Sequence, residues 1–140
     1  MPFDFLTFNP APTREMHEYG KFLLSKLDEA KLVPKVIVCT VDFKPAPNNC
    51  HVNCMEWALR NDGHKMATGW WVMDQRQMLG HVRFFAHSVM ADQDLSLYDI
   101  TPGEQREKYA FLLSDLNADD YQRMEQTLIE TYGVSMFDAR

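Results

Sequence analysis

The chain has 140 residues, of which 46% are hydrophobic and 24% are charged, and its formal net charge is −6. This size and composition predict one soluble globular domain over residues 1–140. No apolar run approaches the roughly 18 residues needed to cross a bilayer, and no basic stripe of the kind that follows a phosphate backbone is present. We therefore expect neither a membrane nor a nucleic acid as a partner.

The opening stretch, MPFDFLTFNPAP, has no basic segment ahead of an apolar run, and its prolines interrupt the region where a signal peptide would be continuous. We therefore expect a cytoplasmic protein. The sequence contains three cysteines, and an odd number without an export signal favours free thiols over a disulfide framework. Each cysteine is consequently a candidate core residue, ligand or nucleophile.

The first third of the chain predicts a helix followed by a strand. Apolar residues recur at helical spacing over residues 14–31, with Thr13 as the N-cap. Pro34 then precedes KVIVCTV, residues 35–41, a β-branched run of strand length. Cys39 lies inside this run, and a free cysteine in such a place behaves as a small apolar core residue. We therefore predict that Cys39 is buried.

The rest of the chain predicts a loop, a helix, several strands and a last helix. FKPAPNN is a loop, because two prolines two residues apart fit neither a helix nor a central strand. A helix runs from Cys50 to the stop signal RNDG. ATGWWVM, RFFAHSVMA and LSLYDIT are typical of strands, YAFLLSDL fits a strand or a docking segment, and ADDYQRMEQTLIETYG predicts a helix ending at Gly133. This order predicts an α+β fold with a mostly antiparallel sheet.

The stretch PNNCHVNC places Cys50 at the head of the second predicted helix. The thiolate is favoured there because unpaired N–H groups and the helix dipole point towards it. Asn48 and Asn49 precede it as candidate caps or hydrogen-bond donors. Cys54 lies one turn further along the same face and is predicted in the core. His51 is expected at the rim of the site, because adjacent helical residues diverge by about 100° and do not face each other.

Two later residues can complete a site around Cys50. Strand alternation places His87 and Asp99 on otherwise apolar faces, where an imidazole and a carboxylate each need a polar partner. If the loop between their strands comprises residues 92–94, the two side chains lie opposite each other, whereas a two-residue loop separates them. The three residues then fit the roles of nucleophile, base and orienter. The other histidines are expected to be solvated polar residues on a helix surface or beside turns: His17, His64 and His81.

This order of cysteine, histidine and aspartate resembles the transglutaminase-like branch of the papain-like cysteine proteins. The likeness lies in FAHSVMADQDLSLYDITP, in NNCHVN ahead of WALR, and in the aromatic strand GWW between them. It covers residues 36–103 and leaves residues 1–35 and 104–140 as terminal extensions. The resemblance implies a papain-like core, in which a cysteine-bearing helix packs on the antiparallel sheet, with extra helices at both ends.

The roles that the resemblance implies are Cys50 as nucleophile, His87 as base and Asp99 as orienter. The backbone N–H of Cys50, together with Asn48 or Asn49, is the candidate oxyanion donor. The implied activity is acyl transfer without a cofactor. The thiolate attacks an amide or ester carbonyl of a peptide or other substrate, and the acyl group then passes to water or to an amine.

Other interpretations stay open at this point. Trp70 and Trp71 are candidates for an aromatic wall of the substrate cleft, although an aromatic strand also suits a core. Cys50, Cys54 and histidines such as His51 offer zinc-type ligands, but no second ligand pair at tight spacing accompanies them. A non-enzymatic binding protein on the same fold is a further alternative, because a fold does not define a function.

Overall fold

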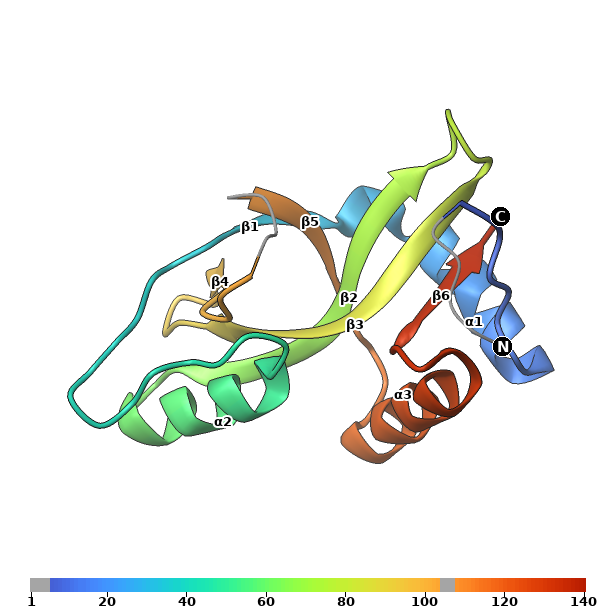
Figure 1. The fold of residues 1–140 in the computed structure, drawn as a ribbon. Coiled ribbons are helices and arrows are strands. Elements are labelled where there is room, and N and C mark those ends of the chain that lie inside the picture. The colour runs from blue at the N-terminus through green and yellow to red at the C-terminus, as the bar shows by residue number, and fades with distance from the viewer. Residues whose placement is uncertain (1–5, 104–107) are drawn as a thin grey trace.

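The protein's computed structural model describes residues 6–103 and 108–140, and within them it contains three α-helices and a six-stranded sheet (Figure 1). The helices are α1 (Arg14–Ser25), α2 (Cys50–Arg60) and α3 (Ala118–Tyr132). The strands are β1 (Lys31–Pro34), β2 (Lys65–Gln75), β3 (His81–Ala91), β4 (Leu97–Tyr98), β5 (Lys108–Leu113) and β6 (Met136–Ala139). The fold is α+β, as predicted. Residues 1–5 and 104–107, which fall in the two predicted terminal extensions, lie outside the described residues.

The strands pair antiparallel in the order β1-β5-β2-β3-β4, and β6 also pairs with β3. The long β2–β3 hairpin runs from the pair Lys65 and Ala91 to the pair Gln75 and His81. β5 belongs to the last third of the chain but lies between β1 and β2. The sheet therefore includes strands from both sides of residues 36–103.

The outer edge of β3 has two different strand partners. β6 pairs with residues 82–85, and β4 pairs with residues 90–91. Residues 86–89 lie between these two pairings. The first turn of α2 reaches this stretch, where the His51 side chain forms a hydrogen bond with Ser88. Two elements far apart in the sequence thus meet at the edge of β3.

The hydrophobic core is divided between the two ends of the β2–β3 hairpin. α1, α3 and β6 pack around Trp70, Phe84 and Phe137 at one end. α2 packs on Met90 through Cys54 at the other end. In Figure 1, α2 lies beside the start of β2, whereas α1 and α3 lie towards β6. The middle of β3 therefore lies between two helical groups.

Both terminal helices follow their predicted signals. Thr13 caps α1 by accepting a hydrogen bond from the Met16 N–H at 3.1 Å. α1 ends at Ser25, earlier than predicted, and a short 3₁₀ turn, Leu27–Glu29, follows it. α3 ends at Gly133, whose φ of 78° lies in the left-handed region that glycine adopts without steric cost.

The strand predicted for residues 35–41 is misplaced. β1 ends at Pro34, and the chain beyond it forms a loop in which Cys39 is exposed, not buried as predicted. The Val36 N–H still donates to the Asp99 carbonyl at 2.8 Å, but no described strand pairs with the residues that follow. β-branched residues favour strands only where a neighbouring surface accepts them. Strand propensity alone therefore misplaced this element.

His81 is 1% exposed, which corrects the expectation that it is a solvated residue beside a turn. The Phe8 ring lies against it, and Asp138 approaches its Nε2 at 3.4 Å. Asp138 belongs to β6, a strand that sequence analysis did not predict and whose residues are all buried. A strand this short leaves little periodic signal in the sequence, so the pairing of β6 with the start of β3 was not predicted.

The connection between β3 and β4 is longer than predicted. Ala91 pairs with Leu97, so the loop comprises residues 92–96 and has five residues in place of three. A change of two residues preserves the alternation of side chains, whereas a change of one would invert it. Asp99 therefore still reaches His87, although the two residues are not directly opposite each other.

Candidate active site

The structure brings together Cys50, His87 and Asp99, the residues predicted as nucleophile, base and orienter. Cys50 is the first residue of α2, His87 lies in β3, and Asp99 directly follows β4. His87 Nε2 and Asp99 Oδ2 form a hydrogen bond of 3.0 Å, and Cys50 and His87 line the same pocket. A carboxylate, an imidazole and a thiol thus lie in series.

A buried asparagine fixes the loop that leads into Cys50. Asn53 accepts a hydrogen bond from the Ala46 N–H at 3.0 Å and donates to the Ala46 carbonyl at 2.8 Å. The same side chain donates to Thr101 Oγ1 at 3.1 Å. Because Asn53 lies one turn inside α2, it ties the preceding loop and the strand end near Asp99 to the helix that carries the thiol.

Asn48 and Asn49 lie at the rim of the site. Both are exposed and line the same pocket as Cys50. Asn48 turns the chain with a φ of 58°, a conformation that asparagine tolerates better than most residues. Asn49 is the N-cap of α2, but its side chain makes no capping hydrogen bond. The first-turn N–H groups of α2 are therefore left for another acceptor.

A tyrosine from α3 holds the backbone of His87. The Tyr121 hydroxyl accepts a hydrogen bond from the His87 N–H at 3.1 Å and donates to the Gly69 carbonyl at 2.7 Å. Gly69 and His87 are paired residues of β2 and β3, so this hydroxyl bridges the two strands. Gly69 has no room for a side chain, because an added Cβ would clash with the Leu112 carbonyl oxygen. These contacts fix the strand position that carries the imidazole.

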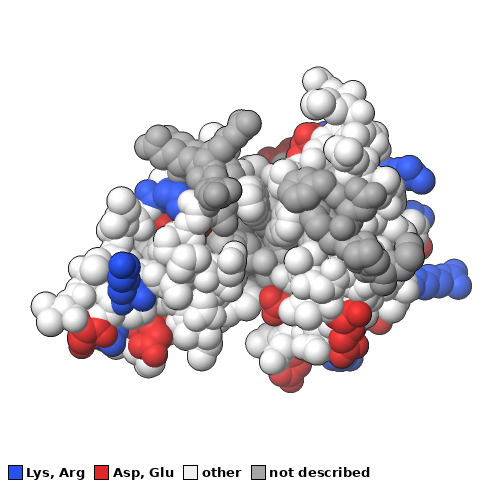
Figure 2. Space-filling view, viewed as in Figure 1, with Lys and Arg blue, Asp and Glu red and all other residues white. Residues whose placement is uncertain are grey.

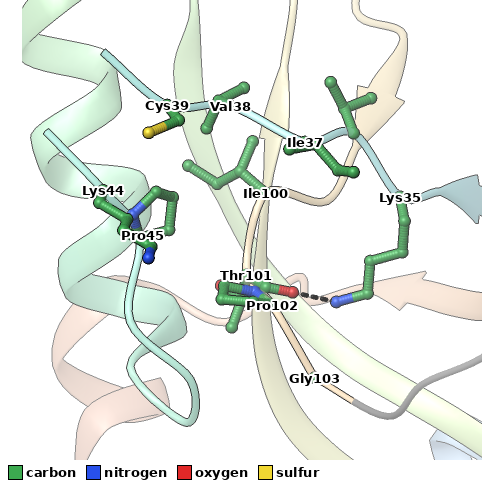
Figure 3. Close-up of a pocket in the computed structure, with 11 residues that line it drawn as sticks. Lys35, Ile37, Val38, Cys39, Lys44, Pro45, Ile100, Thr101, Pro102 and Gly103 are labelled. Carbon is green, nitrogen blue, oxygen red and sulfur yellow. Dashed lines mark hydrogen bonds between the residues drawn. The ribbon is translucent and has the colours of Figure 1, made fainter. Parts of the chain in front are cut away.

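Asp99 is fully buried and is surrounded by hydrogen-bond donors. Its Oδ1 accepts from the Thr101 N–H at 2.9 Å. Its Oδ2 lies 3.0 Å from His87 Nε2 and 3.1 Å from Lys35 Nζ. Figure 3 shows that the Lys35 side chain also reaches the Thr101 carbonyl. These hydrogen bonds replace those that the carboxylate would make with water. Without them, burial of the charge would cost free energy.

A second imidazole, that of His51, lines the same pocket as the thiol. His51 Nε2 lies 2.6 Å from Glu125 Oε2 of α3, and His51 Nδ1 is hydrogen-bonded to Ser88 Oγ of β3. His51 thus lies in the lining of the site, and Glu125 and Ser88 hold its ring beside the first turn of α2.

The two imidazoles lower the pKa of the thiol between them. Burial raises the pKa of Cys50, but hydrogen bonds and charge from His51 and His87 outweigh it and bring the pKa down to about 6. Burial lowers the pKa of each histidine, and their hydrogen-bond partners reverse this effect. Cys50 and Glu125 raise the pKa of His51 to about 10, and Asp99 and Cys50 raise that of His87 to about 9. At neutral pH the favoured state is a thiolate between two imidazolium rings.

Cys54 is fully buried, which confirms that it belongs to the core. Burial, together with the negative charges of Cys50 and Asp99, raises the pKa of the Cys54 thiol. It therefore stays protonated and is a poor metal ligand or nucleophile. Among residues 6–103 and 108–140, no group of three or more His, Cys, Asp or Glu side chains is arranged to hold a metal ion. The zinc-binding alternative has no matching site in this part of the chain.

The thiol opens onto a pocket of about 590 Å³ between α2 and α3. One side of this pocket carries the polar groups already described. The other side is apolar and is formed by Val52, Trp71, Phe85, Ala86, Ile129 and Val134. On the face drawn in Figure 2, charged side chains lie mainly towards the margins and uncharged surface fills much of the middle. The pocket thus combines polar and charged side chains, among them Cys50 and His87, with apolar ones.

The two tryptophans of GWW lie in different environments. Trp70 is fully buried, donates a hydrogen bond to the Tyr19 hydroxyl at 3.0 Å and packs against Phe137. It therefore does not line the cleft, contrary to the prediction. Trp71 packs on Phe85 with ring centroids 5.5 Å apart and lines the pocket. Successive residues of a strand point to opposite faces, so only one of the pair can reach the site.

A second pocket, of about 420 Å³, shares one lining residue with the first, Thr101. Figure 3 shows that Ile37, Val38 and Ile100 contribute apolar side chains to it, and that Lys35 extends along it. Its walls come from the loop that follows β1 and from the chain that follows Asp99. The two pockets therefore adjoin through the residues that hold the carboxylate.

Sequence analysis missed several residues that complete the site. Glu125, Ser88 and Lys35 are distant in sequence from Cys50, and no local pattern relates them to it. The one usable signal is helical spacing: Glu125 follows Tyr121 by one turn and shares its face of α3. Finding these partners requires knowledge of how α3 and the loop after β1 pack on β3.

No family model, no curated protein and no solved structure matches this chain. The functional argument therefore depends on the residues and on their geometry. Within residues 6–103 and 108–140, none of the helices has both the length and the apolar character required to cross a bilayer.

Proposed function

We propose that the protein is a cysteine-dependent acyl-transfer enzyme, with Cys50 as nucleophile, His87 as general base and Asp99 as the residue that orients the imidazole. The observation that carries this proposal is that Cys50 lines one pocket with His87, whose imidazole is hydrogen-bonded to the buried Asp99 carboxylate. The imidazoles of His51 and His87 also lower the pKa of the thiol to about 6. Such a thiol is largely thiolate at neutral pH, and the thiolate is the reactive nucleophile.

In the first half of the reaction, His87 holds the proton taken from Cys50 Sγ, and the thiolate attacks the carbonyl carbon of an amide or ester. The carbonyl electron pair moves onto oxygen, where first-turn N–H groups of α2 can stabilise the charge. The tetrahedral intermediate then collapses. The bond to the leaving nitrogen or oxygen breaks, His87 gives its proton to the leaving group, and the acyl group remains on Sγ as a thioester.

In the second half, water or an amine attacks the thioester carbonyl and His87 takes its proton. The second intermediate collapses, the electron pair returns to Sγ, and an acid or a new amide is released. Water gives hydrolysis and an amine gives acyl transfer. The cycle needs no oxidant, reductant or cofactor, because only protons and an acyl group move.

We include a papain-like core of the transglutaminase-like type in this proposal. Three features support it: the chain order Cys50, His87, Asp99, the position of the cysteine at a helix start, and the antiparallel pairing of the strands beside the histidine and aspartate. In addition, β5 lies between β1 and β2, so the sheet contains strands from both ends of the chain.

The shape of the pocket favours substrates with an apolar acyl group. Trp71 and Phe85 form a tilted aromatic pair in its wall, and Ile129 and Val134 are 43% and 37% exposed beside it. Apolar side chains exposed around a reactive centre gain free energy when a ligand covers them. We therefore infer a peptide, amide or ester substrate whose acyl part is aliphatic or aromatic.

The test compares the three thiols and then looks for the acyl-enzyme. Purified protein is treated with limiting iodoacetamide at pH 6.5, and labelling is mapped by mass spectrometry. Cys50 should react about tenfold or more faster than Cys39, which is exposed but outside the site, and than buried Cys54. With 4-nitrophenyl butyrate, a burst of 4-nitrophenol should match the enzyme concentration and be absent in Cys50→Ser. Equal labelling of Cys39 and Cys50 without a burst would contradict the proposal.

One observation favours a second candidate, a non-enzymatic binding protein. The loop after β1 exposes apolar side chains, including Ile37, which is 98% exposed, and Val36. Exposed apolar residues in one segment are typical of interaction surfaces. Slow and equal labelling of all three thiols in the experiment above would support this candidate over the enzyme.

A further inference from the structure

The surroundings of Cys50 are nearly symmetric, and only one side of them is used in the proposed reaction. On one side His87 is bound to Asp99, and Lys35 is bound to Asp99 in turn. On the other side His51 is bound to Glu125. Cys50 lines the same pocket as both imidazoles, each of which is bound to a carboxylate.

We propose that His51, held by Glu125 and Ser88, is a positioning residue that retains Cys50 as a thiolate independently of His87. This inference rests on the proposed function, and it assigns separate roles to the two imidazoles. His87 exchanges protons with the leaving group and with the acceptor. His51 keeps its proton and holds the sulfur in its ionised form.

The contacts of the two rings support this division. Both nitrogens of His51 have partners from other elements: Nε2 contacts Glu125 of α3 at 2.6 Å, and Nδ1 contacts Ser88 of β3. A ring held at both nitrogens cannot turn to follow a leaving group, and it stays in the lining of the pocket that Cys50 shares. Glu125 supplies a negative charge that favours the imidazolium form. His51 is therefore better suited to holding charge than to transferring protons.

Other titratable groups near the thiol do not supply this charge. Burial raises the pKa of Cys54 on α2 and of Tyr121 on α3, and both stay neutral at neutral pH. Lys35 contacts Asp99 and not the sulfur. Among the described residues that face Cys50, His51 and His87 are therefore the cations that can favour the thiolate.

The experiment measures the pKa of the Cys50 thiol from the pH dependence of iodoacetamide alkylation, which needs no substrate. His51→Gln should raise this pKa by about one unit or more, because a cation in the lining of the same pocket is lost. His87→Gln should also raise it, yet leave it below the value of about 8.5 of a free thiol. The double variant should reach or exceed that value, because burial then acts without either imidazolium.

Three further variants complete the test. Glu125→Gln should raise the thiol pKa in the same direction as His51→Gln but less, and it serves if His51→Gln does not fold. His64→Gln removes an imidazole that is hydrogen-bonded to Tyr98, outside the pocket that Cys50 lines, and should leave the thiol pKa unchanged. Turnover should fall much further in His87→Gln than in Glu125→Gln.

The outcomes separate this inference from the proposed function. An unchanged thiol pKa in both His51→Gln and Glu125→Gln would overturn the role of His51, even if the enzyme turns over esters. Raised thiol pKa values in a protein without any acyl-enzyme burst would support the role of His51 and overturn the proposed activity.

Discussion

Two buried polar clusters lie along the same strand, and they differ in what surrounds them. At the start of β3, Arg83 Nε donates to Asp138 Oδ1 at 2.8 Å and Arg83 Nη2 donates to Asp138 Oδ2 at 3.0 Å. The Asn9 N–H also donates to this carboxylate at 2.8 Å. Further along β3, His87 and Ser88 contact the Cys50 site.

The first cluster is sealed and the second is open. Arg83 and Asp138 are almost fully buried, and they join β3 to β6 and to the chain before α1. The second cluster has a thiol with a lowered pKa at its centre and lines a pocket. Burial of charge therefore does not by itself indicate chemistry, because structural ion pairs are buried too. The two clusters differ because the second one contains a thiol that lines an accessible pocket.

The test with the largest expected effect replaces each of the two buried histidines of β3 by asparagine in separate variants. His87→Asn should lower kcat/KM by about 10²–10⁴-fold, because the general base is lost. His81→Asn should leave kcat/KM near the wild-type value and lower the free energy of unfolding by about 1–2 kcal/mol through lost packing. Ester turnover and urea unfolding measure the two effects. A loss of turnover in His81→Asn with normal activity in His87→Asn would reverse the roles given to the clusters.

The two aspartates extend the same comparison. Asp138→Asn leaves the Arg83 guanidinium buried without its charge partner, so the free energy of unfolding should fall by about 3–5 kcal/mol. Asp99→Asn should cost less stability, because the Lys35 side chain is 17% exposed and His87 can become neutral. Its main effect should be a loss of kcat/KM of about 10²-fold or more. Guanidinium chloride unfolding and ester turnover, measured on both variants, decide between these patterns.

The pH dependence of turnover tests which cluster titrates. kcat/KM should rise as Cys50 loses its proton, with an apparent pKa of about 6, and fall about tenfold per unit at lower pH. It should fall again above an apparent pKa of about 9, where His87 loses the proton that the leaving group needs. His81→Asn should shift neither limb. A profile without the acidic limb would contradict the lowered thiol pKa.

The smallest effect is expected at Lys35. Lys35→Met removes one of the donors that hold Asp99, and the resulting misplacement of the carboxylate should lower kcat/KM by about tenfold. Lys44 lines the same second pocket, so Lys44→Met is the matched control and should change kcat/KM by less than about twofold. Equal effects of the two substitutions would indicate that the positive charge of the pocket matters and that the contact with Asp99 does not.

The elements that sequence analysis predicted well are those with strong local periodicity. α1, α2, α3 and the β2–β3 hairpin each carry such a pattern, together with capping or turn residues such as Thr13 and Gly133. The misplaced strand after Pro34 and the unpredicted β6 depend on which edges are free to pair, and no local pattern reports this.

The same division holds within the site. Cys50, His87 and Asp99 were identified because each residue type is unusual at its position in a helix start or an apolar strand. His51 was expected only at the rim, and its bond to Glu125 of α3 was not predicted. Glu125 had no local feature that distinguished it from other surface carboxylates.

One turn of α3 connects both sides of the thiol. Tyr121 binds the backbone of His87, and Glu125, four residues later, binds the ring of His51. These contacts join residues far apart in the chain, and they add to the bonds of His87 with Asp99 and of His51 with Ser88. A chain cut before α3 would therefore keep Cys50 but lose one hydrogen-bond partner of each of these two histidines.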